Sequence, residues 1–302
     1  MKNENVFDVI IIGGSYAGLS AAMALGRSLR KVLLIDSGLP CNKQTPQSHN
    51  FITLDGEKPA IITKKAKEQV LQYKTIIFYE GVAVKGKKVK DYFRISTNSL
   101  EEFYAKKLIF ATGIKDILPT IKGFSDCWGI SVVHCPYCHG YEIKDKKTAI
   151  FAQGEKAFHL ASLVNNLTKD VTLITSNISL LEDEQIQKLE KHNIKIIDKE
   201  IIEVVHQVGY LNQLIFNDGS QENFEAVYAA VPFTQHCSIP LELGCEITEM
   251  GHLKVDFLQK TTISGVFACG DNSSMLRSVA HAVASGNMCG AMVNMELIKE
   301  EF

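Results

Sequence analysis

The sequence predicts an α/β protein built on two nucleotide-binding folds. Two stretches indicate this, because residues 7–36 and residues 147–174 each read as a strand, a tight turn, a helix and a second strand. The strands are short continuous apolar runs such as Phe7–Ile12, which are typical of strands buried on both faces of a parallel sheet. A chain of 302 residues is also long enough for two domains, each with its own core.

The composition is that of an ordinary globular protein, with 46% hydrophobic residues, 22% charged residues and a formal charge of −2. This charge gives no reason to expect nucleic acid or an anionic membrane as a partner. No apolar run reaches about 18 residues, so no transmembrane helix is expected. Met1–Asn5 leads into a strand without the apolar segment of a secretory leader. Eight mostly isolated cysteines suit a reducing compartment, so a cytoplasmic protein is expected.

The first glycine-rich turn has the pattern of a dinucleotide site. Strand 7–12 runs into Gly13-Gly14-Ser15-Tyr16-Ala17-Gly18, a helix of small residues follows, and strand 31–36 ends on an acid. Backbone N–H groups at the start of such a helix bind a pyrophosphate, and the acid binds ribose hydroxyls. Ser15 replaces the second glycine of the G-x-G-x-x-G pattern, although Gly14 beside it still allows a phosphate to approach closely. The candidate cofactor residues of this turn are Gly13, Gly14, Ser15, Ala17, Gly18 and Asp36.

The segment after this strand pair reads as a polar loop over residues 38–55. A loop in this place can cover a cofactor, so its candidates for cofactor contact are Asn42, Thr45 and His49, although a solvated loop side chain is the simpler interpretation of each. Residues 59–73 read as an amphipathic helix, and the alternating pattern within 76–104 indicates a small antiparallel sheet. The next buried strand closes on Ala111-Thr112-Gly113, whose small residues let the backbone pass close to a cofactor.

The middle of the chain carries Cys135 and Cys138, flanked by His134 and His139. Two cysteines at this spacing can close a small disulfide ring, and a nearby base can help one of them become a thiolate. Zinc is the main alternative, but a zinc site needs a second pair of ligands at similar spacing, and the other cysteines stand singly. A structural disulfide is the third interpretation. We predict a redox pair and no metal site.

Two further motifs lie near the C-terminus, the strand-and-turn Gly265–Asp271 and the segment Arg277–Val279. Together with the earlier motifs they occur in the order of low-molecular-weight thioredoxin reductases, which the whole chain resembles. The resemblance implies two Rossmann-like, three-layer domains, the second inserted into the first. It implies an FAD-binding domain of residues 1–114 and 240–302, an NAD(P)-binding-like domain of residues 115–239 that carries the cysteine pair, and a homodimer. The additional FAD contacts that it implies are Ala111, Thr112, Gly113, Gly270, Asp271, Arg277, Ser278 and Val279.

The second nucleotide fold departs from that family. Ala152 replaces the first glycine of its turn, and Glu155 would repel a pyrophosphate at the start of the helix. Thr175-Ser176-Asn177 stands where thioredoxin reductases place a His-Arg-Arg run that holds the 2′-phosphate of NADPH, and residues 172–187 contain no Arg or Lys. Two lost hydrogen bonds to a charged phosphate weaken binding by roughly tens- to thousands-fold. We therefore expect a retained fold with a degenerate NADPH site.

Some residues are instead similar to a second branch of the same family, the dithiol oxidases that close disulfides in gliotoxin- and holomycin-type natural products. These enzymes carry a histidine immediately before the first cysteine, as His134 does, and an asparagine in the loop after the second FAD strand, where Asn42 is a match. Thioredoxin reductases have an acid after the second cysteine, and this chain has His139 there.

The resemblance also implies the roles of the redox residues. Cys138 would face the flavin and Cys135 the substrate. From its own chemistry, His134 or His139 would move the proton, because imidazole titrates near neutral pH, and a purely structural role is the alternative for either histidine. The substrate is then a thiol or disulfide, either a small protein such as thioredoxin or a small-molecule dithiol. Three functions stay open: a reductase fed through FAD, an oxidase that passes electrons from a dithiol through FAD to oxygen, and a flavin-based redox sensor. A degenerate NADPH site favours the oxidase, whereas a donor other than NADPH would keep the reductase.

Overall fold

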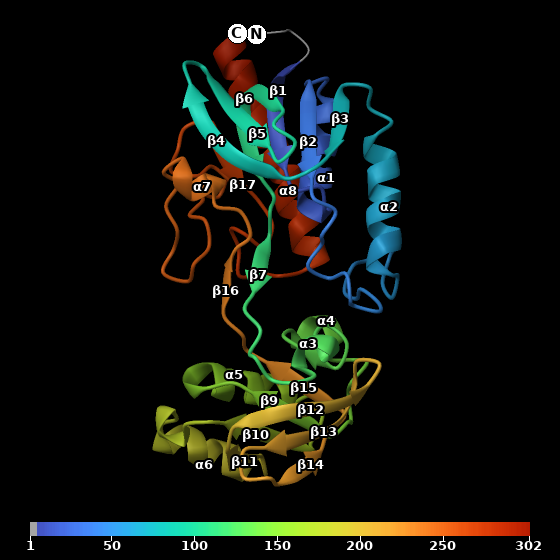
Figure 1. Ribbon diagram of the computed structural model, residues 1–302, viewed down its shortest axis with the longest axis vertical. Helices are drawn as coiled ribbons and strands as arrows, with labels where there is room; N and C mark the ends of the chain where they lie inside the picture. The colour runs from blue at the N-terminus through green and yellow to red at the C-terminus, as the bar shows by residue number, and fades with distance from the viewer. Residues whose placement is uncertain (1–4) are drawn as a thin grey trace. The chain divides into compact units, whose positions relative to one another are not determined.

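The computed structural model describes residues 5–302 and divides into two compact units (Figure 1). Among the described residues, the first unit consists of residues 5–43, 50–115 and 233–302, and the second of residues 44–49 and 116–232. Each unit is built on a parallel sheet, so the predicted α/β fold is confirmed. The assignment of one unit to FAD and of the other to a pyridine nucleotide stays a prediction. The expectation that the chain lacks a secretory leader was based partly on residues 1–4, which lie outside the described residues.

A seven-stranded sheet forms the centre of the first unit, in the order β3-β2-β1-β6-β5-β4, with β17 also paired to β6. Its parallel strands are β1 (Val6–Ile12), β2 (Val32–Asp36), β3 (Ile76–Glu80), β6 (Glu102–Phe110) and β17 (Val266–Ala268). The antiparallel extension consists of β5 (Tyr92–Thr97) and β4 (Ala83–Val89). The expected antiparallel sheet over 76–104 is therefore corrected at its start, because β3 pairs in parallel with β2. The β-branched and aromatic residues of 76–80 fit either kind of pairing, so periodicity alone does not decide between them.

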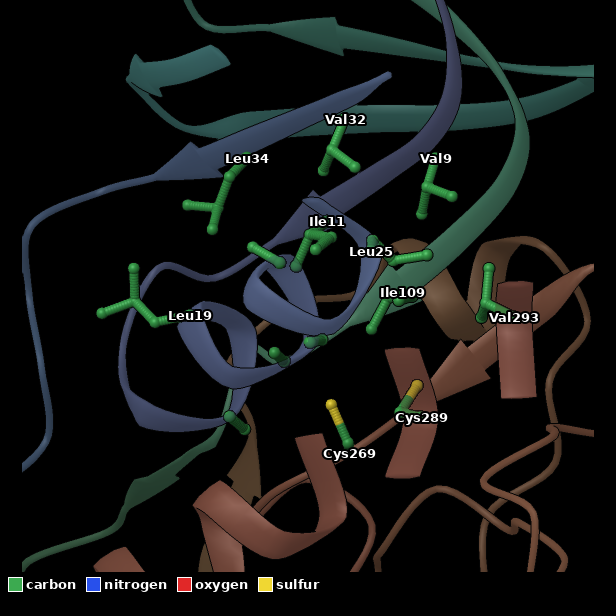
Figure 2. Packing of buried hydrophobic residues seen from close by; sticks show 14 of the residues in the cluster. Val9, Ile11, Leu19, Leu25, Val32, Leu34, Ile109, Cys269, Cys289 and Val293 are labelled. Carbon is green, nitrogen blue, oxygen red and sulfur yellow. The ribbon is translucent and has the colours of Figure 1, made fainter. Parts of the chain in front are cut away.

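Helices α1 (Tyr16–Arg27), α2 (Pro59–Val70) and α8 (Val279–Glu301) belong to this unit. Figure 2 shows strand residues such as Ile11 and Ile109 packing with Leu25 of α1 and Val293 of α8 in one buried cluster. The two helices approach closely because small residues line their crossing: a Cβ added at Gly286 would lie 2.1 Å from the carbonyl oxygen of Ala17. Helix α8 runs on to Glu301, almost the end of the described residues.

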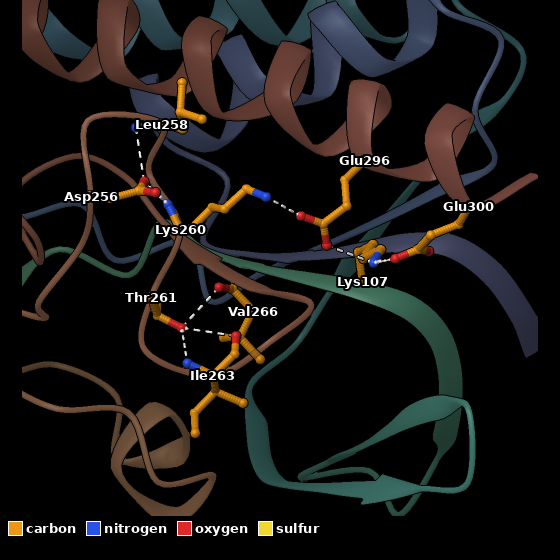
Figure 3. Close-up of polar contacts among 9 residues, drawn as sticks. All are labelled: Lys107, Asp256, Leu258, Lys260, Thr261, Ile263, Val266, Glu296 and Glu300. Atoms are coloured by element: carbon orange, nitrogen blue, oxygen red, sulfur yellow. Dashed lines mark hydrogen bonds and ion pairs between the residues drawn. The ribbon is translucent and has the colours of Figure 1, made fainter.

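A buried lysine ties the end of α8 to the sheet (Figure 3). Lys107 of β6 is 4% exposed, and its Nζ donates to Glu296 at 2.7 Å and to Glu300 at 2.5 Å. Lys260 Nζ reaches the other oxygen of Glu296 at 2.5 Å. A lysine is tolerated in such a place only when it is paired. The sheet and the last turns of α8 are thus joined by a charge network.

The second unit contains a five-stranded parallel sheet in the order β11-β10-β9-β15-β8. The strands of this sheet are β8 (Val132–Val133), β9 (Thr148–Phe151), β10 (Val171–Thr175), β11 (Lys195–Asp198) and β15 (Ala226–Ala229). The helices of the unit are α3 (Phe124–Cys127), α4 (Pro136–His139), α5 (Gly154–Val164), the 3₁₀ turn η2 (Ile178–Leu180) and α6 (Asp183–Lys191). A three-stranded antiparallel sheet adds β12 (Ile201–Gln207), β13 (Tyr210–Phe216) and β14 (Gln221–Asn223), which the sequence did not predict.

The chain passes from one unit to the other along β7 (Ile114–Asp116) and returns along β16 (Phe233–Gln235), and these two strands pair with each other. A short helix, α7 (Ile239–Glu242), follows the return strand. Within residues 5–302, no helix combines the length and the apolar character that crossing a membrane requires.

Candidate active site

Gly13 and Gly18 shape the turn between β1 and α1 in the first unit. Gly13 has φ +105°, and a Cβ there would lie 2.2 Å from the carbonyl oxygen of Ala111. A Cβ at Gly18 would lie 1.8 Å from the carbonyl oxygen of Gly13. Only glycine fits such close backbone approaches. The start of α1 is therefore held against the ends of β1 and β6.

The N-terminus of α1 is suited to an anion. Ser15 is its N-cap but makes no side-chain capping bond, and no acidic residue occurs in the first turn of this described helix. The N–H groups of a first turn have no partner within the helix and carry partial positive charge, which favours a phosphate. Gly14 N–H donates to Asp36 Oδ1 at 2.9 Å, so the acid at the end of β2 is fixed beside the turn. These residues fit the pyrophosphate and ribose of a dinucleotide.

The Gly-Asp turn after β17 lies against Ala111-Thr112-Gly113. Asn272 is completely buried, and its Nδ2 donates to the carbonyl oxygen of Phe110 at 2.8 Å and lies 3.4 Å from Thr112 Oγ1. Gly270 has φ +83°, and its N–H donates to Ser285 Oγ of α8 at 3.1 Å. Asn272 was missed by the sequence reasoning, and its place directly after Asp271 is the signal that could have found it.

The remaining candidates of the first unit gather at the same edge. Arg277 Nε lies 3.8 Å from Asp271 Oδ2. Ser278 caps α8, since its Oγ accepts the N–H of His281 at 3.1 Å, and Val279 is the first residue of that helix. In the loop after β2, Asn42 Nδ2 donates to the Tyr16 hydroxyl at 3.2 Å, at the start of α1.

Thr45 and His49 lie in segment 44–49, which the structure groups with the second unit, and their contact with a cofactor stays a prediction. Gln44 Nε2 donates to the carbonyl oxygen of Ser125 at 3.3 Å. His49 Nε2 lies 3.5 Å from Glu142 Oε1, just beyond the cysteine pair. This segment therefore contributes a histidine to the surroundings of the cysteines.

Cys135 and Cys138 lie at the two ends of one helical turn. Cys135 is the N-cap of α4, Pro136 is its first residue, and the N–H of Cys138 donates to the carbonyl oxygen of Cys135 at 3.3 Å. Proline is favoured at this first position, because its fixed φ suits a helix and its missing N–H would have no helical partner. Residues three apart lie on the same side of a helical turn, and both thiols are half-buried. The turn presents a pair that can exchange between dithiol and disulfide.

The two flanking histidines lie in different environments. The ring of His134 stacks on Trp128, with centroids 6.0 Å apart. Burial lowers the pKa of His139, nearby Glu142 partly offsets this effect, and His49 lowers the pKa further. His139 is therefore neutral at neutral pH and can accept a proton. Glu142 was missed by the sequence reasoning, although an acid only three residues after His139 is a signal that could have found it.

The turn into α5 in the second unit has a different character. Gly154 has φ +54°, and a Cβ there would lie 3.3 Å from the carbonyl oxygen of Leu180, because η2 packs on α5. Gln185 Nε2 donates to Glu155 Oε2 at 2.6 Å, which fixes a carboxylate in the first turn of the helix. A 2′-phosphate needs charged donors, and residues 172–187 contain no Arg or Lys. Residues 172–187 therefore offer no positively charged side chain to a 2′-phosphate.

In the described part of the chain, no group of three or more His, Cys, Asp or Glu residues is arranged to hold a metal ion. The cysteine pair and its histidines thus do not form such a cluster.

Comparison with known proteins covers both units. Residues 7–286 match the family described as pyridine nucleotide-disulphide oxidoreductase. The chain is 32% identical to thioredoxin reductase tcpT of Claviceps purpurea, over 99% of this chain and 97% of the relative. It is 34% identical to the solved oxidoreductase from Agrobacterium tumefaciens, with a TM-score of 0.91 over 97% of this chain and 99% of that one. It is 26% identical to the crystal structure of HlmI, with a TM-score of 0.93 over 100% of this chain and 95% of that one.

Proposed function

Because this chain belongs to the pyridine nucleotide-disulphide oxidoreductase family, we propose that it is an FAD-dependent dithiol/disulfide oxidoreductase. The thioredoxin reductase-like resemblance that the sequence predicted is confirmed, and with it an enzyme that acts on sulfur groups. The observation that carries the proposal is the turn α4 of the second unit, which holds Cys135 and Cys138 on one side.

The first unit supports FAD as the cofactor. Gly13 and Gly18 bring the turn close to the strand ends, the start of α1 accepts a pyrophosphate, and Asp36 would bind ribose hydroxyls. Asp271 and the segment Arg277–Val279 lie at the same edge and would hold the remainder of the cofactor. When bound, FAD supplies a carrier that takes an electron pair from a dithiol or gives one to a disulfide.

The cysteine pair carries out the exchange with the substrate. In the oxidising direction, a substrate thiolate attacks the Cys135 sulfur of the Cys135–Cys138 disulfide, the bond between the two cysteines breaks, and Cys138 leaves as a thiolate. The second substrate thiol then attacks the substrate sulfur of the mixed disulfide and releases Cys135. The substrate gains a disulfide and loses two electrons to the protein. The reducing direction runs through the same bonds in reverse.

His139 is the best-placed group to move the proton. Burial keeps its imidazole neutral, so it can take a proton from a substrate thiol at neutral pH. Glu142 stabilises the imidazolium that results, because a carboxylate favours a nearby positive charge. His134, which is stacked on Trp128, remains the alternative acid or base.

We propose further that the electrons do not come from NADPH. The fixed carboxylate of Glu155 at the start of α5 supports this, as does the absence of basic residues over 172–187. An enzyme that takes no electrons from NADPH is better suited to the oxidising direction than to the reducing one. This favours a dithiol oxidase that passes electrons to oxygen. The name thioredoxin reductase carried by the relative tcpT favours a second candidate, a reductase that uses another donor.

Anaerobic stopped-flow spectroscopy of the purified full-length protein tests the proposal. We expect bound flavin to be bleached by a dithiol such as dithiothreitol, and peroxide to form when air is admitted. Bleaching by NADPH alone would instead establish a conventional reductase and would overturn the proposed direction. A flavin that neither reagent bleaches would support a redox sensor, and a protein that binds no flavin would end the proposal.

A matched variant separates the cysteines from the flavin. Cys237 is half-buried in the first unit, outside the segments assigned to the cofactor, so Cys237→Ser controls for the loss of a thiol. We expect Cys138→Ser to retain FAD but not to be bleached by the dithiol, whereas Cys237→Ser is still bleached.

A further inference from the structure

A glutamine side chain in the return strand joins two separate segments of the first unit. Gln235 lies in β16, and its Nε2 donates to the carbonyl oxygen of Gly251 at 2.9 Å and to that of Asn272, also at 2.9 Å. The nitrogen of a carboxamide carries two N–H donors, so this one atom satisfies both carbonyl groups. The two backbone segments are thereby held at a fixed distance from β16.

The oxygen of the same carboxamide has no comparable use. Gln235 Oε1 is buried and has no hydrogen-bond partner among the described residues. A buried acceptor without a partner is unfavourable, and a methionine would fill a similar space without one. The two donated hydrogen bonds are therefore what this position requires of its side chain.

One of the two carbonyl groups belongs to the residue that follows Asp271. Its oxygen accepts the N–H of Leu253 at 2.8 Å in addition to the amide of Gln235. On the other side of Asp271, the N–H of Gly270 is bonded to α8, and the side chain of Asn272 is bonded to the end of β6. Asp271 thus lies between two residues whose backbone is fixed by the surrounding elements.

The strand that carries Gln235 is also joined to the other part of the candidate cofactor site. β16 pairs with β7, which begins directly after Ala111-Thr112-Gly113. The same strand pair therefore continues one cofactor segment along the chain and holds the turn of Asp271 through a side chain. Gln235 is the residue by which β16 reaches that turn.

We propose that Gln235 is a positioning residue of the flavin site, which holds the turn at Asn272 so that Asp271 is directed toward the cofactor. The inference rests on the proposed FAD-dependent function. Gln235 acts through the backbone of Asn272 and not by contact with the cofactor. A turn that is ordered before the cofactor arrives loses less conformational freedom on binding, and this strengthens binding.

The affinity for FAD tests this role. Gln235→Met removes both polar atoms, whereas Gln235→Glu keeps the shape and replaces the donor nitrogen with an acceptor. Gln69 is an exposed residue of α2 in the same unit, so Gln69→Met and Gln69→Glu are the matched controls. Each full-length variant is freed of flavin, and the Kd for added FAD is measured by flavin fluorescence at pH 8 and at pH 5.5.

We expect Gln235→Met to raise the Kd for FAD about tenfold, because two hydrogen bonds to the turn are lost. Gln235→Glu should bind still more weakly at pH 8, where its carboxylate meets two carbonyl oxygens, and should recover about tenfold at pH 5.5. Burial raises the pKa of a carboxyl group, and a protonated carboxyl donates one hydrogen bond again. A residue that only stabilises the fold would not give this recovery. A Kd in Gln235→Met equal to that in Gln69→Met, or no recovery of Gln235→Glu, would overturn the proposed role.

Hydrogen–deuterium exchange of the same proteins separates this inference from the proposed function. In Gln235→Met we expect the amides of residues 270–276 to exchange about tenfold faster than in Gln69→Met, because the turn opens more often. Equal exchange rates would overturn the inference, whether or not flavin is bound. An unchanged protein that binds no FAD would overturn the proposed function instead, and the exchange comparison would still decide whether Gln235 holds the turn.

Discussion

Replacing Lys107 with methionine should release the end of α8 from the sheet. Methionine fills much of the space of the lysine stem but leaves Glu296, whose side chain is 16% exposed, with one of its two cations. Breaking a buried ion pair from one side costs about 3–5 kcal/mol. Glu296 keeps Lys260 at 2.5 Å and Glu300 is half exposed, so we expect a smaller loss of about 2 kcal/mol in the free energy of unfolding.

The assay is thermal unfolding followed by two probes. The loss should lower the midpoint of the first unit by about 4–8 °C, as measured by circular dichroism. Trp128 is the only tryptophan of the chain and lies in the second unit, so its fluorescence supplies an internal reference that should not move. The neighbouring Lys106 also pairs with α8, through Glu301, but is 36% exposed. Lys106→Met is therefore the control and should cost less than about 1 kcal/mol.

The loss of stability caused by Lys107→Met should also depend on pH. Burial acts to raise the pKa of Glu296, but the hydrogen bonds from Lys107 and Lys260 bring it below the ordinary glutamate value. A depressed acid pKa stabilises the fold above the ordinary value, and that stability is lost as pH falls through the lowered pKa. The difference between Lys107→Met and the unchanged protein should therefore shrink below about pH 4. The reasoning is refuted if Lys107→Met is no less stable than Lys106→Met at pH 7.

Further predictions concern the helix crossing, acid stability and the base near the cysteines. Gly286→Ala should lower stability by about 1–3 kcal/mol in chemical denaturation, because its Cβ meets the backbone of Ala17; an equal or higher midpoint would contradict the close packing. Burial lowers the pKa of His252, and Arg277 lowers it further, so its contribution to stability is lost as pH falls below the ordinary histidine value. In His252→Gln the unfolding midpoint should fall less between pH 7 and pH 5 than in the unchanged protein, and an equal fall would contradict this role of His252. His139→Gln should slow bleaching by dithiol about 10²-fold without loss of flavin, and bleaching at the original rate would assign the proton transfer to another group.

Local patterns allowed much of the fold and of the candidate site to be predicted from the sequence. The turn from Gly13 to Gly18, Asp36 and the cysteine pair are each recognisable within a few residues, because their chemistry depends on spacing along the chain. The buried strands were predicted for the same reason, since each is a continuous apolar run.

Features that depend on distant pairing could not be predicted in this way. The sheet of β12, β13 and β14 consists of short, half-exposed strands whose register is set only by their neighbours. The pairing of β15 with β8 joins residues more than ninety positions apart, and no local pattern marks it. The ion pair of His49 with Glu142 likewise joins residues more than ninety positions apart.

The split of the first unit between both ends of the chain has a consequence for biosynthesis. All of segment 116–232 has been translated before β17 and α8, which complete the sheet at β6 and cover α1. Domains generally fold as units while the chain emerges from the ribosome. The second unit, which carries Cys135 and Cys138, can therefore fold first, whereas the first unit is complete only after α8 has been made. Premature termination before Val266 would release a chain with this cysteine pair in place but without β17 and α8 of the first unit.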